Sequence, residues 1–392
     1  MDHVLRCHEI VKTDMVRGRD CYLYDAHDKR YIDFEAGVWC TALGHNHRRV
    51  NQAIRAQTEQ IIHIGYRYTN DLTEEAAVEL LGTVALPDGK CTFLSSGSEA
   101  VEFGVQTARR ITGQPLLLTL SDSYLAAYGS AGRKSPEEWY CLDWSACAAC
   151  PHADECDPQC SHLRAIPFES IGGLVFEPGN THGLVRFPPQ QLIQTLVRRV
   201  RQRHGLVVVD EVTTGLGRTG AWYGFQHYSL RPDVIAMGKG LGNGYPVSAV
   251  VMTRGIADRL ENSGFRYAQS HQDDPLGCAI AREVITVIRE EGLVERSDRV
   301  GTRFLRELEH LGERHDIVKE ARGRGLMIAL EFEDSDERFS VTSVYRELLK
   351  RGFIVGYNPA ANLLRFYPAL TIGEEDIAQL LENLDHILEV SI

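Results

Sequence analysis

The chain has 392 residues, of which 43% are hydrophobic and 24% are charged, a balance that suits a globular protein of two or three lobes. Its formal net charge of −12, without a block of Lys and Arg, argues against a nucleic acid or an anionic membrane as partner. The first residues contain no apolar core of signal-peptide length, and no run is long enough to span a bilayer. We therefore expect a cytoplasmic protein.

The N-terminal region predicts a short hairpin and then an anion site. The hairpin turns at residues 25–29 and is expected to pack against a later domain. Farther along, Ser95-Ser96-Gly97-Ser98 follows a short strand and opens a helical pattern that runs to Arg110. Free N–H groups at a helix start, beside small residues, suit a bound phosphate. Read alone, the same serines could be an ordinary helix cap.

Apolar strands alternate with helical patterns through the middle of the chain. Strand-like runs begin near residues 115, 172, 205, 232 and 246, and Pro189 opens an amphipathic helix between two of them. This alternation predicts a largely parallel sheet covered on both faces. Ligands of such sheets lie beyond the carboxyl ends of the strands, where Asp210 and Lys239 both fall.

After about residue 284 the pattern changes to long helices with a few strands. We expect a smaller α+β domain at 286–392, a large domain at 45–285 and an N-terminal segment, 1–44, that packs with the small domain. Thr371 and Glu374 have the spacing of a capping box before the last helix.

Lys239 carries the most specific signal. It lies between Gly238 and Gly240 after an apolar strand, 29 residues beyond Asp210. A lysine that forms a Schiff base and a carboxylate that keeps a pyridine nitrogen protonated are what pyridoxal phosphate chemistry requires. The runs DEVTTGLGRTG and DVIAMGKGLGNGYP closely resemble the class III (ω-amino acid type) aminotransferases. The resemblance covers nearly the whole chain and implies the type I, aspartate-aminotransferase-like fold.

The resemblance also implies a set of cofactor contacts. Its phosphate loop corresponds to Ser96, Gly97 and Ser98. The other positions that would contact the cofactor are the stacking Tyr124, Val212 on the opposite ring face, Thr213 at the phenolic oxygen, and Ser270 at the phosphate of a neighbouring subunit. The last of these implies a homodimer with shared active sites.

Substrate contacts follow in the same way. Arg365 matches the arginine that receives a substrate carboxylate, for which a bidentate, permanently charged guanidinium is suited. Glu177 matches a glutamate near the substrate side of the ring and could pair with Arg365 when a substrate lacks that carboxylate. Val38 and Trp39 are expected to be pocket walls.

Three positions depart from the family pattern. Leu125 follows Tyr124 where the family has histidine, Thr213 stands where it has glutamine, and His182 stands where several relatives carry a second glutamate that gates the arginine. We interpret His182 as a rim residue. The last departure weakens any assignment of ornithine or acetylornithine as substrate.

A cysteine cluster follows within the large domain, in a segment at 141–162 that we interpret as a Cys-rich insertion. Cys147, Cys150, Cys156 and Cys160, with Cys141 in reserve and His162 nearby, have the clustering of a metal knuckle. In a reducing compartment a disulfide framework is the weaker explanation. We expect a structural zinc, ahead of an iron–sulfur cluster; a redox sensor over the active-site mouth is the alternative role.

The residues therefore predict an aminotransferase that moves an amino group from an amino acid, ω-amino acid or diamine to a 2-oxo acid in a ping-pong cycle, with Lys239 and Asp210 as catalytic residues. Racemases, epimerases, decarboxylases and an aminomutase use the same scaffold and remain open. A non-catalytic, metal-bearing regulatory protein is the remote alternative, and the intact Asp210 and Lys239 argue against it.

Overall fold

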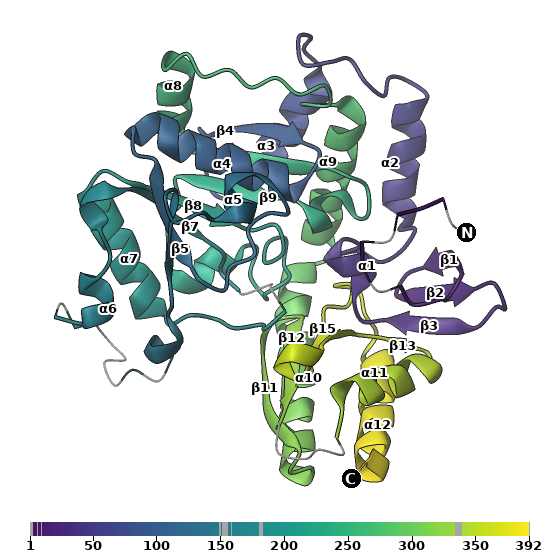
Figure 1. Cartoon of the computed structure of the whole chain (residues 1–392). Coiled ribbons are helices and arrows are strands. Elements are labelled where there is room, and N and C mark those ends of the chain that lie inside the picture. The colour runs from purple at the N-terminus through teal and green to yellow at the C-terminus, as the bar shows by residue number, and fades with distance from the viewer. Residues whose placement is uncertain are drawn as a thin grey trace.

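The structure, a computed structural model, describes residues 3–5, 7–8, 10–148, 150, 156–157, 159–179, 183–333 and 339–391. Its described strands form three sheets (Figure 1). The strands are β1 (Met15–Arg19), β2 (Tyr22–Asp25), β3 (Arg30–Asp33), β4 (Lys90–Leu94), β5 (Leu116–Leu120), β6 (Trp139–Leu142), β7 (Ile171–Phe176), β8 (Leu206–Asp210), β9 (Val234–Met237), β10 (Ser248–Met252), β11 (Val318–Arg324), β12 (Met327–Phe332), β13 (Phe353–Ile354), β14 (Gly356–Asn358) and β15 (Leu363–Phe366).

The helices of the described residues are α1 (Ala36–Trp39), α2 (Arg48–Thr58), α3 (Asp71–Thr83), α4 (Gly97–Thr112), α5 (Gly129–Arg133), α6 (Ser161–Arg164), α7 (Gln190–Gln202), α8 (Arg254–Asn262), α9 (Pro275–Glu290), α10 (Leu293–Arg314), α11 (Val341–Lys350) and α12 (Glu374–Ser391). None of them is both long enough and apolar enough to cross a membrane.

A seven-stranded sheet forms the centre of the molecule. Its strand order is β4-β10-β9-β8-β7-β5-β6; β9, β8, β7, β5 and β6 pair in parallel, and β10 is antiparallel to both of its neighbours. Alternate residues of β8 enter different cores: Val208 joins the cluster that holds the α4 side chains, and Val207 and Val209 join the one that holds α7. The sheet is therefore covered on both faces, as apolar strands predict.

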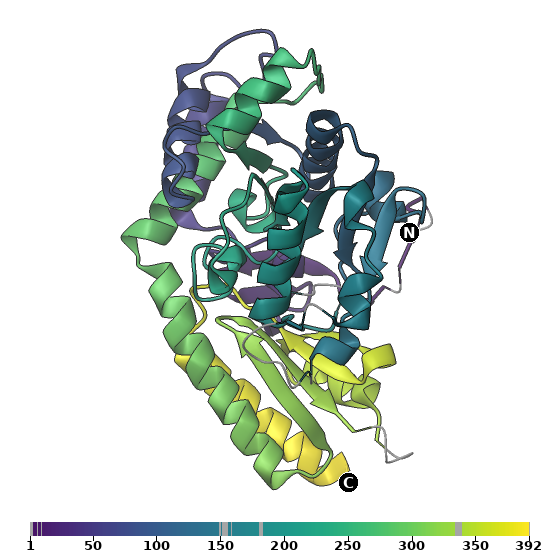
Figure 2. The same cartoon turned by 90° about the vertical axis from the view of Figure 1, so that its left-hand side faces the viewer.

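The two ends of the chain meet in the smaller part of the molecule. Strand β13 pairs in parallel with β3 and so extends the N-terminal sheet β1-β2-β3. The other small sheet, β11-β12-β15-β14, is antiparallel, and α10 and α12 run alongside each other next to it (Figure 2). This arrangement brings residues near 35 close to residues near 365.

The predicted α/β architecture with its largely parallel sheet is confirmed, whereas the capping box is wrong. Helix α12 begins at Glu374, so Thr371 lies before the residue that caps the helix. The Thr371 hydroxyl instead donates to the carbonyl of Leu43 at 3.4 Å. A contact with the N-terminal segment takes the hydroxyl that the sequence assigns to the helix end. The limits of the three expected domains stay a prediction.

Candidate active site

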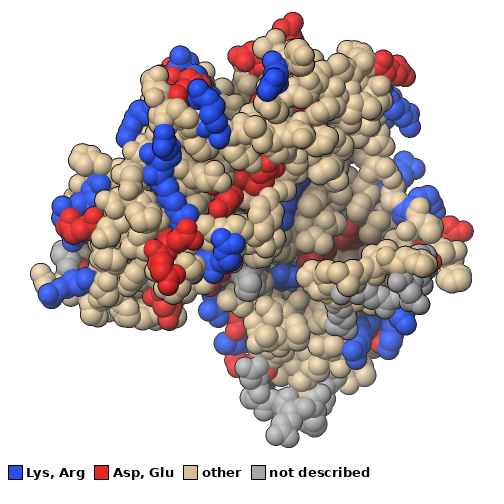
Figure 3. Space-filling view, turned by 45° about the horizontal axis from the view of Figure 1, so that its top comes forward, with Lys and Arg blue, Asp and Glu red and all other residues tan. Residues whose placement is uncertain are grey.

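Asp210 and Lys239 lie beside each other at the carboxyl ends of neighbouring strands. Asp210 is the last residue of β8, where it pairs with Ala236 of β9, and Lys239 opens the 3₁₀ turn that follows β9. Lys239 has a φ of 41°, an uncommon conformation for a residue with a side chain. Its Nζ donates to the Thr213 hydroxyl at 2.8 Å. In Figure 3 the surface is hollowed between the large sheet and the small part, and charged side chains are visible inside the hollow.

Burial favours the neutral form of both Asp210 and Lys239. It raises the pKa of Asp210 to about 6, against the opposing effects of the Val212 amide and Lys239. It also lowers the pKa of Lys239, while Asp210 and Glu177 act in the opposite direction. A buried lysine with a lowered pKa is a better nucleophile and proton acceptor at neutral pH than a solvated one. The buried Asp210 carboxylate accepts a hydrogen bond from the Val212 amide at 2.9 Å. A buried carboxylate is stabilised by a cation beside it.

The start of α4 is a cradle beside these two groups. Ser96 caps the helix, with its hydroxyl accepting from the Glu99 amide at 3.2 Å, and Ser98 accepts from the Ala127 amide at 2.9 Å. A Cβ at Gly97 would lie 2.5 Å from Cγ1 of Val212, so only glycine permits this approach. The amides of the first turn have no acceptor within the helix and suit an anion.

Tyr124 and Glu177 meet at the next strand end. The Tyr124 amide donates to Oε2 of Glu177 at 3.0 Å; Glu177 is buried, and the Tyr124 side chain is 40% exposed. The following Leu125 has a φ of 62° and is buried, so at the position of the family's histidine this chain turns an apolar side chain inward.

The turn after β3 holds Val38 and Trp39, the residues expected as pocket walls. Both Val38 and Trp39 have positive φ, and the buried Asp33 carboxylate holds the turn by accepting from the amides of Glu35 (2.8 Å) and Gly37 (3.1 Å). Val38 is 62% exposed. The Trp39 ring lies 5.2 Å from Nζ of Lys239 and 5.3 Å from Cζ of Arg365. One indole is therefore flanked by the two cations.

The carboxylate that lies next to Arg365 is Glu35, whereas the one expected from the sequence is Glu177. Nη2 of Arg365 lies 3.9 Å from Oε1 of Glu35, and both side chains are largely buried. Glu35 and Tyr367 were not anticipated from the sequence, although both carried a signal. Tyr367 directly follows β15, two residues after Arg365, and this spacing places alternate residues of an extended chain on one face. Glu35 begins the turn that holds Val38 and Trp39.

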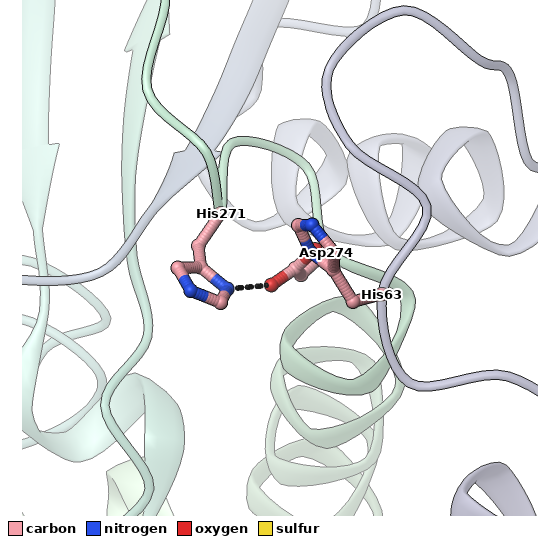
Figure 4. A group of neighbouring side chains, drawn as sticks. All are labelled: His63, His271 and Asp274. Atoms are coloured by element: carbon pink, nitrogen blue, oxygen red, sulfur yellow. Dashed lines mark hydrogen bonds and ion pairs between the residues drawn. The ribbon is translucent and has the colours of Figure 1, made fainter.

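Ser270 is exposed and lies in the loop that precedes α9. The next residue, His271, contacts Asp274, which also contacts His63. In Figure 4 the Asp274 carboxylate lies between the rings of His63 and His271, with ring nitrogen to oxygen distances of 2.5 and 2.6 Å. Asp274 is the residue at the N-cap position of α9, but its carboxylate contacts the two histidines and does not cap the helix. His63 comes from the segment after α2. The cluster ties the Ser270 loop to that segment.

The four cysteines of the predicted metal knuckle border one pocket of about 250 Å³, together with His162. Each is partly buried, and Cys141 is exposed. Among the described residues, His63, His271 and Asp274 alone form a group of three metal-ligating side chains whose ligand atoms all lie within 4.8 Å. The thiols are thus gathered but more widely spaced than in a closed metal site. His182 lies outside the described residues.

Two curated proteins are similar to this chain over nearly its whole length. A leucine/methionine racemase from Thermococcus litoralis is 28% identical over 400 residues, covering 95% of this chain and 90% of that protein. An acetylornithine aminotransferase from Methanopyrus kandleri is 31% identical over 386 residues, covering 96% of this chain and 94% of that protein.

Solved structures share the fold. A Bacillus anthracis aminotransferase superposes with a TM-score of 0.89 at 23% identity, covering 99% of this chain and 96% of that one. An amine transaminase from an uncultivated Pseudomonas species, in its pyridoxal phosphate-bound form, gives 0.87 at 24% identity, covering 100% and 99%. The predicted aminotransferase fold is thereby confirmed.

The family model described as aminotransferase class-III matches residues 6–126 and 142–388. All four clustered cysteines lie within the second matched stretch, and residues 127–141 lie outside both. Pyridoxal phosphate is the cofactor that this family implies, and the lysine, the buried acid and the α4 cradle fit its aldehyde, its ring nitrogen and its phosphate. The chain is an enzyme of the class-III aminotransferase family.

Proposed function

We propose that this enzyme moves an amino group from an amino acid, ω-amino acid or diamine to a 2-oxo acid in a ping-pong cycle. The observation that carries the proposal is the shared Trp39 ring, which lies within 5.3 Å of both Lys239 and Arg365. A substrate whose amino end reaches Lys239 can therefore place its carboxylate at Arg365, where the guanidinium offers a bidentate contact.

The residues divide the work of the reaction among them. Pyridoxal phosphate, when bound, supplies an aldehyde and an electron-accepting ring. The α4 cradle would hold the phosphate, Tyr124 and Val212 would flank the ring, and Thr213 would offer its hydroxyl to the phenolic oxygen. Asp210 would keep a proton on the ring nitrogen. The Lys239 amine, once released, removes and returns the proton at the substrate carbon.

A homodimer is part of the proposal. Ile61, Ile62, Tyr66 and Tyr68 are each at least 40% exposed, and the His63–Asp274–His271 cluster fastens this segment to the Ser270 loop. An exposed apolar patch of this kind is typical of an interface, and one here would bring Ser270 to the phosphate of a second copy. Light scattering should give the mass of two chains of 43.9 kDa; a monomer that is fully active would contradict the shared site.

Racemisation is the second candidate, because the racemase relative is nearly as similar as the aminotransferases. The two reactions differ in whether nitrogen leaves the donor. We expect single donors such as glutamate, alanine, ornithine, β-alanine or a diamine, added without a 2-oxo acid, to release about one oxo product per site and to bleach the yellow colour. Inversion of an amino acid over many turnovers, with no oxo product, would replace the proposal with the racemase.

We further propose that Cys147, Cys150, Cys156 and Cys160 hold a structural zinc. Burial and the neighbouring thiols Cys160, Cys156 and Cys150 raise the pKa of Cys147. The pKa of Cys156 is raised in the same way, although Thr195 and Arg198 oppose the shift. Gathered thiols thus disfavour one another's thiolate forms, which a divalent cation reverses. To bind zinc with four ligands, the four sulfur atoms would have to move closer together than they are in this structure.

Changing Cys150 to Ser is expected to abolish the binding of about one zinc per chain and to lower Tm, with kcat/KM unchanged. Metal content by mass spectrometry and a thermal melt measure both effects. Cys7→Ser, at an exposed N-terminal cysteine, is the control. Equal metal content and Tm in the two variants would contradict the site, and a brown protein that contains iron would replace zinc by an iron–sulfur cluster.

A further inference from the structure

Four polar atoms around the Trp39 ring lack hydrogen-bond partners among the described residues. They are Oε1 of Glu35, Nε1 of Trp39, Nε of Arg365 and the Tyr367 hydroxyl, all buried. The Trp39 and Tyr367 rings stack at 4.7 Å. Leaving a buried polar group unpaired costs about 1–3 kcal/mol, and such groups are rare in native proteins. Four of them in one place, next to Lys239, indicate a subsite that a ligand completes.

The contact between Glu35 and Arg365 is incomplete in the same sense. Their closest approach, 3.9 Å between Nη2 and Oε1, is longer than a charge-assisted hydrogen bond of about 2.7–2.9 Å. The guanidinium therefore keeps Nε and one edge available for a second carboxylate. A ligand with two carboxylate oxygens could form the paired contact that Glu35 does not form.

The fold makes room for Glu35 at this position. Strand β14 places Gly356 directly opposite Arg365, and a Cβ on Gly356 would lie 1.8 Å from Oε1 of Glu35. The Asp33 carboxylate fixes the Glu35 backbone from the other side. Any side chain on residue 356 would clash with the Glu35 carboxylate, so the position of Glu35 requires glycine at 356.

We propose that Glu35 is a displaceable counterion that occupies Arg365 when no substrate carboxylate is bound and leaves it, protonated, when one binds. The inference rests on the proposed role of Arg365 in binding that carboxylate. It assigns to Glu35, in the N-terminal segment, control over whether the subsite accepts a charged or an uncharged substrate end. The step is balanced: the ligand carboxylate takes the guanidinium, and the Glu35 carboxylate takes one proton from solvent.

The charges around Glu35 support this proton uptake. Burial raises the pKa of Glu35 to about 7; the Arg365 guanidinium is the main group that opposes this shift, and the Asp33 carboxylate adds to it. Tyr367, whose own pKa is raised by burial, is a further titratable group that interacts with the Glu35 carboxyl, and it also interacts with Glu177. A ligand carboxylate would neutralise Arg365, which is the largest influence that keeps Glu35 charged. The affinity for a carboxylate should therefore be highest below about pH 7 and fall as the pH rises above it.

The test is calorimetric titration of the holoenzyme with glutarate, which has carboxylates but no amine. Measured at about pH 7 in two buffers of different ionisation enthalpy, binding should take up a substantial fraction of one proton. The Glu35→Gln variant should take up no proton, and at about pH 8, where wild-type Glu35 is mostly ionised and competes for Arg365, it should bind glutarate about tenfold more tightly than wild type. A merely structural role of Glu35 would not produce the proton uptake.

Arg365→Ala separates the two claims. If glutarate binds wild type and Arg365→Ala equally, the proposed carboxylate site fails. If binding needs Arg365 but no proton is taken up and Glu35→Gln leaves the affinity unchanged, the counterion role alone is overturned. Should Glu35→Gln not fold, the pH dependence of glutarate binding to wild type decides, because a flat profile from about pH 6 to about pH 9 contradicts the inference.

Discussion

Changing Lys239 to Ala is expected to abolish amino transfer, lowering kcat/KM by at least about 10⁴-fold, and to remove the yellow colour of the purified enzyme. The reason is that one amine has two tasks: it holds the cofactor and it moves the proton at the substrate carbon. Burial lowers the pKa of Lys239, which makes the amine available for both tasks. Steady-state kinetics and the visible spectrum measure the two effects.

Two further variants control for charge and for general damage. Lys239→Arg keeps a cation beside Asp210 and Thr213 but cannot form the covalent link, so it should be as inactive and colourless as the alanine variant. Lys90→Ala removes a surface lysine on β4 that pairs with Glu261 at 2.8 Å and should retain colour and activity. An arginine variant that kept its yellow colour would show that the cofactor is held elsewhere.

Changing Asp210 to Asn is expected to lower kcat/KM by about 10²–10³-fold, the usual effect of removing one preorganised electrostatic contact. Asparagine keeps the size of the side chain but cannot stabilise a cation on the ring nitrogen. Most of the loss should fall on kcat, because the proton on that nitrogen matters most while charge develops on the ring.

Glu211 is the matched control for Asp210, since it is the next residue and equally buried. Its carboxylate accepts from the Thr214 hydroxyl at 2.7 Å and from the Gly224 and Phe225 amides at 2.9 and 2.7 Å, and burial raises its pKa to about 7. Glu211→Gln should therefore lower Tm more than it lowers kcat/KM. If the two variants lost equal activity, Asp210 would have no special role.

Asp210 also has a pH signature in the cofactor-free protein. Because burial raises its pKa to about 6, it stabilises the folded state while protonated, and that contribution is lost as the pH rises from about 4 to about 6. Asp210→Asn should thus raise the free energy of unfolding at about pH 8, by about 1–3 kcal/mol, and change it little at about pH 3.5. An equal change at both pH values would contradict this origin of the effect.

The sequence could predict the parts of the site that depend on local pattern. Lys239 and Asp210 each end an apolar strand, and strands of a parallel sheet end at the same edge, so their proximity follows from two short runs. The same holds for α4, whose small residues and serine cap are adjacent in the sequence.

The Glu35–Arg365 contact could not be predicted in that way. It joins residues 330 positions apart, and it depends on the pairing of β13 with β3 and on the positive φ of Val38 and Trp39. Positive φ at non-glycine residues opposes the local preference, so only the tertiary environment explains it. Likewise, nothing in the sequence around His63 or His271 indicates that both contact Asp274, because that contact depends on the tertiary fold.

Borohydride reduction of the purified enzyme, followed by peptide mapping, identifies the lysine that carries the cofactor. Borohydride fixes an imine link between lysine and cofactor, so the added mass reports where the cofactor is attached. We expect one added pyridoxal phosphate group per chain, on the peptide that contains Lys239. Addition at another lysine, or no addition in protein supplied with the cofactor, would contradict it.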